Sequence, residues 1–364
     1  MASAFTLAIN PWVYLAQYQA DGTWSEEHLE QPHKTPAEEA ALPEAERNAL
    51  LAKRNSFPQL PLVNYTTQYG MGAFEGLKAF PQKDGGLKLF RPDENAKRLK
   101  NSMEGLQMPG IPVEMLVEGV KAIVGKNYEL GFAPEYDPAW EKDGFVTARS
   151  IYIRPFTYSE PGIGLNLSEY PWVVAVSTPV GSYFDPDAPA KGITTRCVRA
   201  FPGGTGWIKC DANYVVPTLE KKRVQKLGYM EAIFLDAAEH KYVEEGSSCN
   251  IFFYQKHGTL VTPELGDTVL PGITRKSAIQ LAKDLGVKVE ERPITIEEAM
   301  SETAECFVTG TAAGITYIES IEHEGGTMVF NGGKVGELTR KLQDTLKGIQ
   351  YGVVEDTHGW MFAV

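Results

Sequence analysis

Three groups with useful chemistry follow one another in the second half of this chain of 364 residues. Lys209 supplies an amine, and Glu245 supplies a carboxylate in an apolar region. Residues 270–275 read Leu-Pro-Gly-Ile-Thr-Arg, which is typical of the start of a helix. An amine can form a Schiff base, a carboxylate can pair with a ring nitrogen, and a helix N-terminus can hold a phosphate group. Binding of pyridoxal phosphate requires these three parts.

The sequence before Lys209 is rich in glycine and first suggests a phosphate-binding loop. A Walker loop needs glycine directly before the lysine and serine or threonine directly after it, but Ile208 and Cys210 stand there. A nucleotide site is therefore disfavoured, and a surface turn with an ordinary lysine is the plainer alternative. The apolar neighbours Trp207 and Ile208 favour a partly buried amine, which desolvation makes a usable nucleophile.

Glu244 and Glu245 stand between two apolar stretches that read as strands. Because side chains alternate between the two faces of a strand, we expect only one of these carboxylates to point inward. A buried carboxylate needs a partner, and the nitrogen of a protonated pyridine ring is a suitable one. The alternative is a charged hairpin tip, in which the carboxylates are solvated.

Three further places could hold an anion. The helix expected from Gly272 would present free N–H groups at its start, with the helix dipole behind them. Residues 310–314, Gly-Thr-Ala-Ala-Gly, are small enough to form a backbone anion nest. Arg98 lies on an expected helix. The plainer alternatives are an ordinary helix start, a tight turn and a solvated arginine.

The composition indicates a globular protein with an acidic charge balance. The chain has 35 basic and 47 acidic residues, a formal net charge of −12, which argues against a general nucleic-acid-binding protein. The four cysteines form no Cys-x-x-Cys pair and the six histidines form no cluster, so we expect neither a disulfide framework nor a metal site. We find no basic segment before the apolar start and no membrane-length apolar run, and we expect a cytoplasmic protein without a membrane partner.

Mixed strand and helix signals predict an α+β protein of two domains. Residues 179–189 contain three prolines, which excludes a helix or a central strand there. The predicted domains are therefore 1–178, a small α/β domain, and 192–364, a large α/β domain that carries Lys209, joined by an interdomain loop over 179–191. The expected helices cover 36–54, 93–106 with Asp93 as N-cap, 112–130, 215–227, 272–285 and 335–349. The expected strands cover 147–156, 172–177, 231–236, 242–245, 250–255, 259–261, 287–292 and 305–309.

Taken together, these motifs resemble the fold-type IV pyridoxal phosphate enzymes, and among them the branched-chain amino acid aminotransferases. The resemblance runs from about Tyr65 to the C-terminus, and its motifs are long and in the order of that family. Besides the motifs above, it includes Phe-Glu-Gly-Leu-Lys-Ala-Phe at 74–80, Phe-Arg-Pro at 90–92, Tyr-Ile-Arg-Pro at 152–155, Pro-Val-Gly-Ser-Tyr-Phe at 179–184, and the tail segments 349–352 and 360–362.

The resemblance implies roles for individual residues. Lys209 would be the catalytic Schiff-base lysine, Tyr214 would hydrogen-bond the phenolic oxygen of the cofactor, and Glu245 would pair with the ring nitrogen. The remaining cofactor-binding residues would be Arg98, Ile273, Thr274 and Thr311 at the phosphate and Ser248 in support of Glu245. The residues that contact the substrate would be Tyr69, Phe74, Tyr152, Arg154 for an acidic side chain, Tyr183, and Thr311, Ala312 and Ala313 for the substrate carboxylate.

The implied reaction is the reversible transfer of the amino group of L-leucine, L-isoleucine or L-valine to 2-oxoglutarate, which gives a branched 2-oxo acid and L-glutamate. The implied assembly is a homodimer with shared active sites, in which Tyr69 reaches the pocket of the other subunit. Some members of the family carry a redox Cys-x-x-Cys after the Gly-Thr loop, but Ala313 and Thr316 stand there in this chain, so we expect no such thiol regulation.

Two alternatives lie within the fold type and one lies outside it. D-amino acid aminotransferases and aminodeoxychorismate lyases share the lysine and the glutamate. They are usually shorter, and they lack the combination of the motifs at 74–80 and 152–155. A non-enzymatic anion-binding protein is the alternative from another class, and a borohydride-sensitive yellow colour of the purified protein would distinguish an enzyme from it.

Overall fold

The structure is a computed structural model that describes residues 7–181 and 190–364. Its contacts divide the chain into two compact units. The first contains the described part of Met1–Tyr183 together with Cys210–Ala212 and Gly348–Val364, and the second contains the described part of Phe184–Lys209 together with Asn213–Lys347. No helix in these described ranges is long and apolar enough to cross a membrane.

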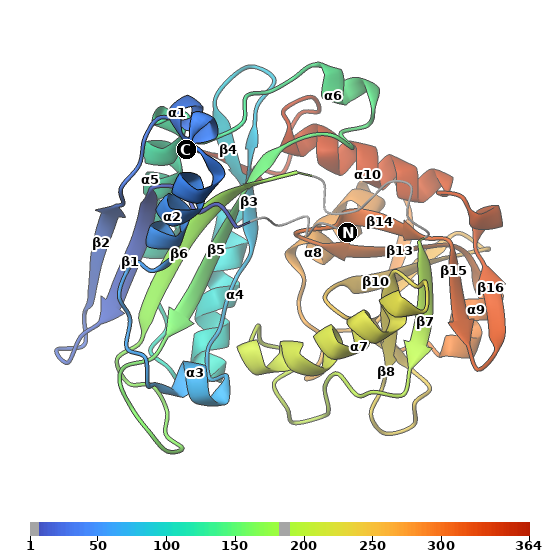
Figure 1. Ribbon diagram of the computed structural model, residues 1–364. Coiled ribbons are helices and arrows are strands. Elements are labelled where there is room, and N and C mark those ends of the chain that lie inside the picture. The colour runs from blue at the N-terminus through green and yellow to red at the C-terminus, as the bar shows by residue number, and fades with distance from the viewer. Residues whose placement is uncertain (1–6, 182–189) are drawn as a thin grey trace. The chain divides into compact units, whose positions relative to one another are not determined.

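The first unit is built on a seven-stranded antiparallel sheet in the order β17-β4-β3-β5-β6-β1-β2 (Figure 1). Its strands are β1 (Trp12–Tyr18), β2 (Trp24–Glu30), β3 (Leu77–Pro81), β4 (Leu87–Phe90), β5 (Ser150–Tyr158), β6 (Trp172–Val180) and β17 (Met361–Ala363). The helices α4 (Pro92–Gly105) and α5 (Val113–Glu129) pack against this sheet, and Leu99, Ile123 and Ile153 are fully buried in the shared core.

Two details of the predicted helices in this unit are wrong. Asp93 is not the N-cap of α4, because Arg91 takes that place with a φ of 49° and Pro92 begins the helix. Proline suits the first helical position, where its missing N–H would have no partner. The single helix expected over 36–54 is two helices, α1 (Pro36–Ala41) and α2 (Glu44–Asn55), because Pro43 interrupts the run.

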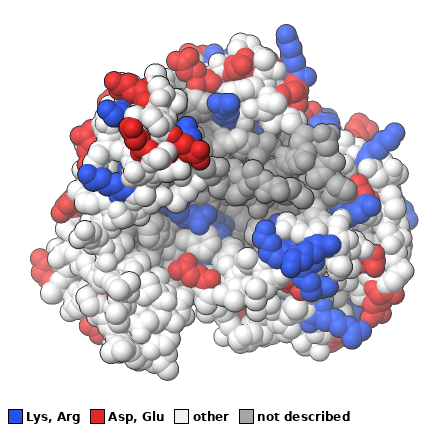
Figure 2. All heavy atoms as spheres, viewed as in Figure 1, with Lys and Arg blue, Asp and Glu red and all other residues white. Residues whose placement is uncertain are grey.

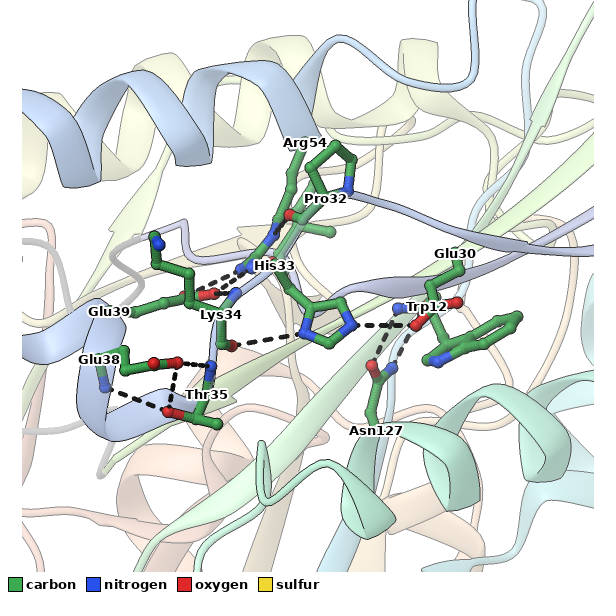
Figure 3. A network of polar contacts seen from close by, with 11 residues as sticks. Trp12, Glu30, Pro32, His33, Lys34, Thr35, Glu38, Glu39, Arg54 and Asn127 are labelled. Carbon is green, nitrogen blue, oxygen red and sulfur yellow. Dashed lines mark hydrogen bonds and ion pairs between the residues drawn. The ribbon is translucent and has the colours of Figure 1, made fainter.

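A buried arginine fixes these short helices in the first unit (Figure 3). The Arg54 guanidinium is 1% exposed, pairs with the Glu39 carboxylate, and donates to the carbonyl oxygen of Pro32 at 3.0 Å. Thr35 and Glu38 form a capping box at the start of α1. Leaving either partner of such a buried pair alone is costly, so this cluster is a structural anchor. The same unit contains α3 (Tyr65–Tyr69) and α6 (Ala139–Lys142).

The second unit contains two five-stranded sheets, in the orders β12-β11-β10-β13-β14 and β16-β15-β7-β8-β9. Their strands are β7 (Lys191–Thr195), β8 (Glu231–Leu235), β9 (Val243–Gly246), β10 (Asn250–Gln255), β11 (Thr259–Thr262), β12 (Lys288–Glu291), β13 (Thr303–Gly310), β14 (Gly314–Ile318), β15 (Ser320–His323) and β16 (Gly326–Val329). Their helices are α7 (Val215–Lys226), α8 (Ile273–Asp284), α9 (Ile296–Glu302) and α10 (Glu337–Gln350), which ends in the first unit.

The apolar pattern of the second unit explains these elements. Buried side chains of β8, β10 and β13, among them Ile233, Phe253 and Val308, share one core. Ala278 and Leu281 are buried on one side of α8, as their helical spacing predicts. All eight expected strands are present in the two units, with ends shifted by up to three residues.

The contact division differs from the predicted domain boundaries at the tail. Residues 348–364 belong with the first unit because β17 pairs antiparallel with β4, so the second domain does not extend to 364. The expected linker begins inside β6, which extends to Val180, and ends at Lys191, the first residue of β7. The rest of that loop, 182–189 with Tyr183, lies outside the described residues.

Charged residues of both signs occupy the face seen in Figure 2, with Lys and Arg gathered near α7. This helix carries Lys221, Lys222, Arg223 and Lys226. Its first turns carry exposed apolar side chains instead, at Val215, Val216 and Leu219.

Candidate active site

Lys209 is held at the end of the glycine-rich turn in the second unit. Its Nζ donates a hydrogen bond of 2.6 Å to the Tyr214 hydroxyl and lies 4.9 Å from the centre of the Tyr214 ring. Asn213 braces the turn, because its Nδ2 donates to the carbonyl oxygens of Thr205 at 2.7 Å and Ile208 at 3.0 Å. Lys209 is half-buried and Ile208 is buried, as expected, whereas Trp207 is 40% exposed.

Glu245 on β9 is a buried carboxylate, 3% exposed, with three partners. Its Oε1 pairs with the Arg199 guanidinium and accepts the Leu270 N–H at 3.0 Å. Its Oε2 accepts a hydrogen bond from Nδ2 of Asn250 at 3.2 Å. Burial raises the pKa of the Glu245 carboxyl, while Arg199, the Leu270 N–H and Lys209 oppose that rise.

Both glutamates of the pair are buried, although only one of them was expected to point inward. Glu244 is 8% exposed, and burial raises the pKa of its carboxyl to about 7. The register of β9 against β8 shifts here, since Glu245 lies opposite Phe234 and Val243 lies opposite Leu235, which leaves no residue of β8 directly opposite Glu244. Such a bulge breaks the strict alternation of faces, so both side chains can turn inward.

The start of α8 offers backbone N–H groups near this carboxylate. Gly272 is the N-cap, and within the described residues no side chain caps the helix. Asn250 Nδ2 also donates to the carbonyl oxygen of Leu270 at 2.9 Å. A Cβ on Gly272 would lie 2.0 Å from Oδ1 of Asn250, so this turn requires glycine. The predicted phosphate residues Ile273 and Thr274 are the first two residues of the helix.

The other residues predicted for the cofactor in this unit lie in two turns. Ser248 is exposed in the turn between β9 and β10, and the described structure gives it no side-chain hydrogen bond to Glu245, for which Asn250 is the partner. The loop Thr311–Ala313 joins β13 to β14, and each of its residues is half-buried. Gly310 lies close to the Ser248 backbone, because a Cβ added at Gly310 would be 3.5 Å from the Ser248 carbonyl oxygen.

Arg98, predicted for the phosphate, lies in the first unit in a buried ion pair. Its Nε and Nη2 donate to the two carboxylate oxygens of Glu75 at 2.6 and 2.9 Å. Asn95 donates to the same carboxylate at 2.7 Å. The arginine is therefore oriented by Glu75, and its contact with a phosphate stays a prediction.

The predicted substrate residues of the first unit form an aromatic group around one arginine. The Arg154 guanidinium lies 4.7 Å from the ring centre of Phe74 and 5.2 Å from that of Tyr152, and it donates to the Tyr152 hydroxyl at 2.7 Å. A Cβ on Gly76 would lie 2.1 Å from that hydroxyl, so glycine is needed beside it. Tyr69, also predicted to contact substrate, ends α3 and is 39% exposed.

Sequence reasoning missed three residues of these clusters, Glu75, Arg199 and Asn250. Glu75 stood inside a motif already noted, and Asn250 is a polar residue at the head of a strongly apolar strand, which was a usable signal. Arg199 carries no such signal, because its position beside Glu245 depends on a long-range contact.

Comparison with known proteins decides the family. A sequence model of the family described as "Amino-transferase class IV" matches residues 72–321. The chain is 41% identical over 305 residues to a protein of Staphylococcus aureus (strain MRSA252) named "Probable branched-chain-amino-acid aminotransferase", and the match covers 81% of each chain.

The chain belongs to the class IV aminotransferases. Its structure is similar to that of the branched-chain aminotransferase of Thermoproteus uzoniensis with norvaline, with a TM-score of 0.72, 27% identity, and 97% and 99% of the two chains covered. It is also similar to the "T.th." branched-chain amino acid aminotransferase complexed with N-(5'-phosphopyridoxyl)-L-glutamate, with a TM-score of 0.70, 28% identity, and 85% and 94% covered. The predicted mixed α+β fold of type IV is thereby confirmed.

Proposed function

We propose that this class IV aminotransferase transfers the amino group of L-leucine, L-isoleucine or L-valine to 2-oxoglutarate, with pyridoxal phosphate as its cofactor. The observation that carries the proposal is the set of groups in the second unit: the Lys209 amine on Tyr214, the buried Glu245 carboxylate, and the start of α8 without a side-chain cap. The names of the similar proteins support the donor class.

The chemistry of this set fits the cofactor. Lys209 would hold it through Nζ, Tyr214 would hydrogen-bond its phenolic oxygen, and Glu245 would pair with its ring nitrogen. The N–H groups of Ile273 and Thr274 would hold its phosphate with the dipole of α8 behind them, and the remaining residues proposed for the phosphate are Arg98 and Thr311. When bound, the cofactor supplies an electron-withdrawing ring that acidifies the α-hydrogen of an attached amino acid.

Lys209 is proposed to move the proton in this reaction. A general base must lie within hydrogen-bond reach of the proton that it removes, and the Tyr214 hydroxyl at 2.6 Å fixes the direction of Nζ. Once the amino acid has displaced it from the cofactor, Nζ as the unprotonated amine would take the proton from Cα of the amino acid and would then donate it to the C4′ carbon of the cofactor. A general acid-base group of this kind contributes about 10²–10⁴-fold in rate.

The aromatic group of the first unit would contact the substrate side chain. The rings of Phe74 and Tyr152 offer an apolar surface to a branched side chain, and Arg154 offers a cation to the distal carboxylate of glutamate. Ser248, the backbone of Thr311–Ala313, and Tyr183, which lies outside the described residues, keep their predicted roles as part of the proposal.

The proposal includes a homodimer with shared sites. Exposed apolar side chains are present on both units, at Leu62, Ile163, Leu165, Val215, Val216 and Leu219. A dimer interface that covered such side chains would remove apolar surface from water. Tyr69 is 39% exposed in its own unit, so its ring is available for the predicted role at the site of the other subunit. That the enzyme acts in the cytoplasm remains a prediction from its composition.

A panel of amino donors with 2-oxoglutarate tests the proposed activity. The three branched L-amino acids should support glutamate formation at the highest kcat/KM, because the proposed pocket is apolar with one cation. D-alanine should give no turnover. Preference for a D-amino acid, or release of 4-aminobenzoate from aminodeoxychorismate, would place the enzyme in another branch of the fold type.

A further inference from the structure

A buried arginine links three segments around Glu245. The Arg199 side chain is 7% exposed, and its Nη2 pairs with Oε1 of Glu245. The same nitrogen donates to the carbonyl oxygens of Thr268 and, at 3.3 Å, of Gly206. Gly206 belongs to the turn before Lys209, and Thr268 belongs to the segment before α8. One guanidinium therefore contacts both of these segments and the carboxylate.

A buried asparagine makes a second link. Asn250 is 5% exposed, and its amide donates both to Oε2 of Glu245 at 3.2 Å and to the carbonyl oxygen of Leu270 at 2.9 Å. Oδ1 of the same amide lies where a side chain on Gly272 would be. The Leu270 N–H also donates a hydrogen bond of 3.0 Å to the Glu245 carboxylate. The carboxylate and the turn before α8 thus form one hydrogen-bonded unit.

We propose that Arg199 and Asn250 are positioning residues that hold Glu245 as a carboxylate and fix its distance from the N-terminus of α8. This inference rests on the proposed function, in which Glu245 pairs with the ring nitrogen and the helix start holds the phosphate. The ring nitrogen and the phosphate of the cofactor are separated by a nearly fixed distance. If Arg199 and Asn250 hold Glu245 and the start of α8 at the matching distance, the cofactor binds with less loss of conformational freedom in the protein.

The two residues have separable effects. Arg199 acts on the charge of Glu245, so its loss should weaken recognition of the ring nitrogen in particular. A carboxyl that became neutral would make a hydrogen bond of roughly half the strength. Asn250 bonds both Glu245 and the turn before α8, so its loss should weaken the contacts of the ring nitrogen and of the phosphate together.

Cofactor binding tests this inference without a measurement of turnover. The full-length chain, freed of cofactor, is titrated with pyridoxal phosphate and with the analogue in which C–H replaces the ring nitrogen. Wild type should prefer pyridoxal phosphate by about tenfold or more, the range for a hydrogen bond between charged groups. Arg199→Met should lower that preference severalfold, and Arg199→Lys should keep part of it. Asn250→Ala should weaken binding of both compounds.

Matched controls come from the first unit. Arg54 is a buried arginine paired with a glutamate, and Asn127 is a buried asparagine that bonds the Trp12 backbone (Figure 3). Arg54→Met and Asn127→Ala should lower the thermal midpoint but leave the preference for the ring nitrogen unchanged. An unchanged preference in Arg199→Met, or equal loss in Arg54→Met, would overturn the inference. A wild type that binds neither compound would instead overturn the proposed function, and the inference with it.

Discussion

Glu244 and Glu245 are neighbours with different surroundings. The Glu245 carboxylate has a guanidinium and two N–H donors, whereas one oxygen of Glu244 is buried without a hydrogen-bond partner in the described structure. A buried carboxyl group stays ionised only when it has such partners, because burial alone favours its neutral form. Burial is the largest cause of the raised pKa of both carboxyls, but at Glu245 the guanidinium and the Leu270 N–H oppose it, so the chemistry at the residue scale depends on what holds Glu245.

Exchange of each glutamate for glutamine tests this assignment. Glu245→Gln should leave a ring nitrogen without its anion and slow proton abstraction sharply in single-turnover assays. Glu244→Gln should be mild, since a carboxyl with a pKa near 7 is already partly neutral at neutral pH. The reverse ranking would show that Glu244 is the ring-nitrogen acid.

Glu244 also predicts a pH dependence of stability. Its pKa rises from 4.5 to about 7 on folding, so the folded state binds more protons between these values. Stability should therefore fall as pH rises from about 4.5 to 7, by at most about 3 kcal/mol for this group. The difference in free energy of unfolding between Glu244→Gln and wild type should grow across that window, and a difference that stays constant with pH would contradict this account.

At the scale of elements, short turns fix the distances between the chemical groups. The bulge in β9 lies beside Glu245, and the turn before α8 and the glycine-rich turn before Lys209 are held by side-chain-to-backbone hydrogen bonds. Gly272 is a position where the space is tight, because any Cβ there would meet Asn250. Loops positioned by a rigid scaffold commonly carry function.

A glycine pair gives a matched test of the turn before α8. Gly272→Ala should force Asn250 away from Leu270 and lower cofactor affinity by about tenfold, the order expected for disturbed hydrogen bonds to charged groups. Gly266→Ala is the control, because a Cβ at Gly266 meets no heavy atom within 4 Å and its φ is not positive. Equal dissociation constants for the two variants would show that the turn does not set the site.

The elements with strong periodic patterns were predictable, and those fixed by long-range contacts were not. The eight expected strands and α4, α5, α7, α8 and α10 follow from apolar spacing and from glycine or proline at their ends. Strands such as β2 and β16 are mostly exposed and depend on their neighbours in the sheet. The bulge at Glu244 and the contact of Arg199 with Glu245 likewise depend on tertiary structure. The same limit explains the misplaced tail, whose strand β17 pairs with β4.

At the scale of the whole molecule, the proposed homodimer predicts that two inactive variants can restore each other's activity. If Tyr69 acts at the site of the other subunit, a two-fold dimer exchanges the same segment in both directions. Two inactive variants, Lys209→Ala and Tyr69→Ala, are then unfolded and refolded together. A mixed dimer should carry one site with both defects and one with neither, so activity should return. Mixed dimers that form and stay inactive would place Tyr69 in the site of its own subunit.

Reduction with borohydride followed by mass mapping tests the central claim most directly. The claim is that Lys209 Nζ, held on the Tyr214 hydroxyl, carries the cofactor. Wild-type protein treated with borohydride should lose its yellow colour and show a phosphopyridoxyl group on the peptide that contains Lys209. Lys209→Ala should remain folded, carry no label, and show no transamination. A label on another lysine, or wild-type turnover in Lys209→Ala, would contradict the account.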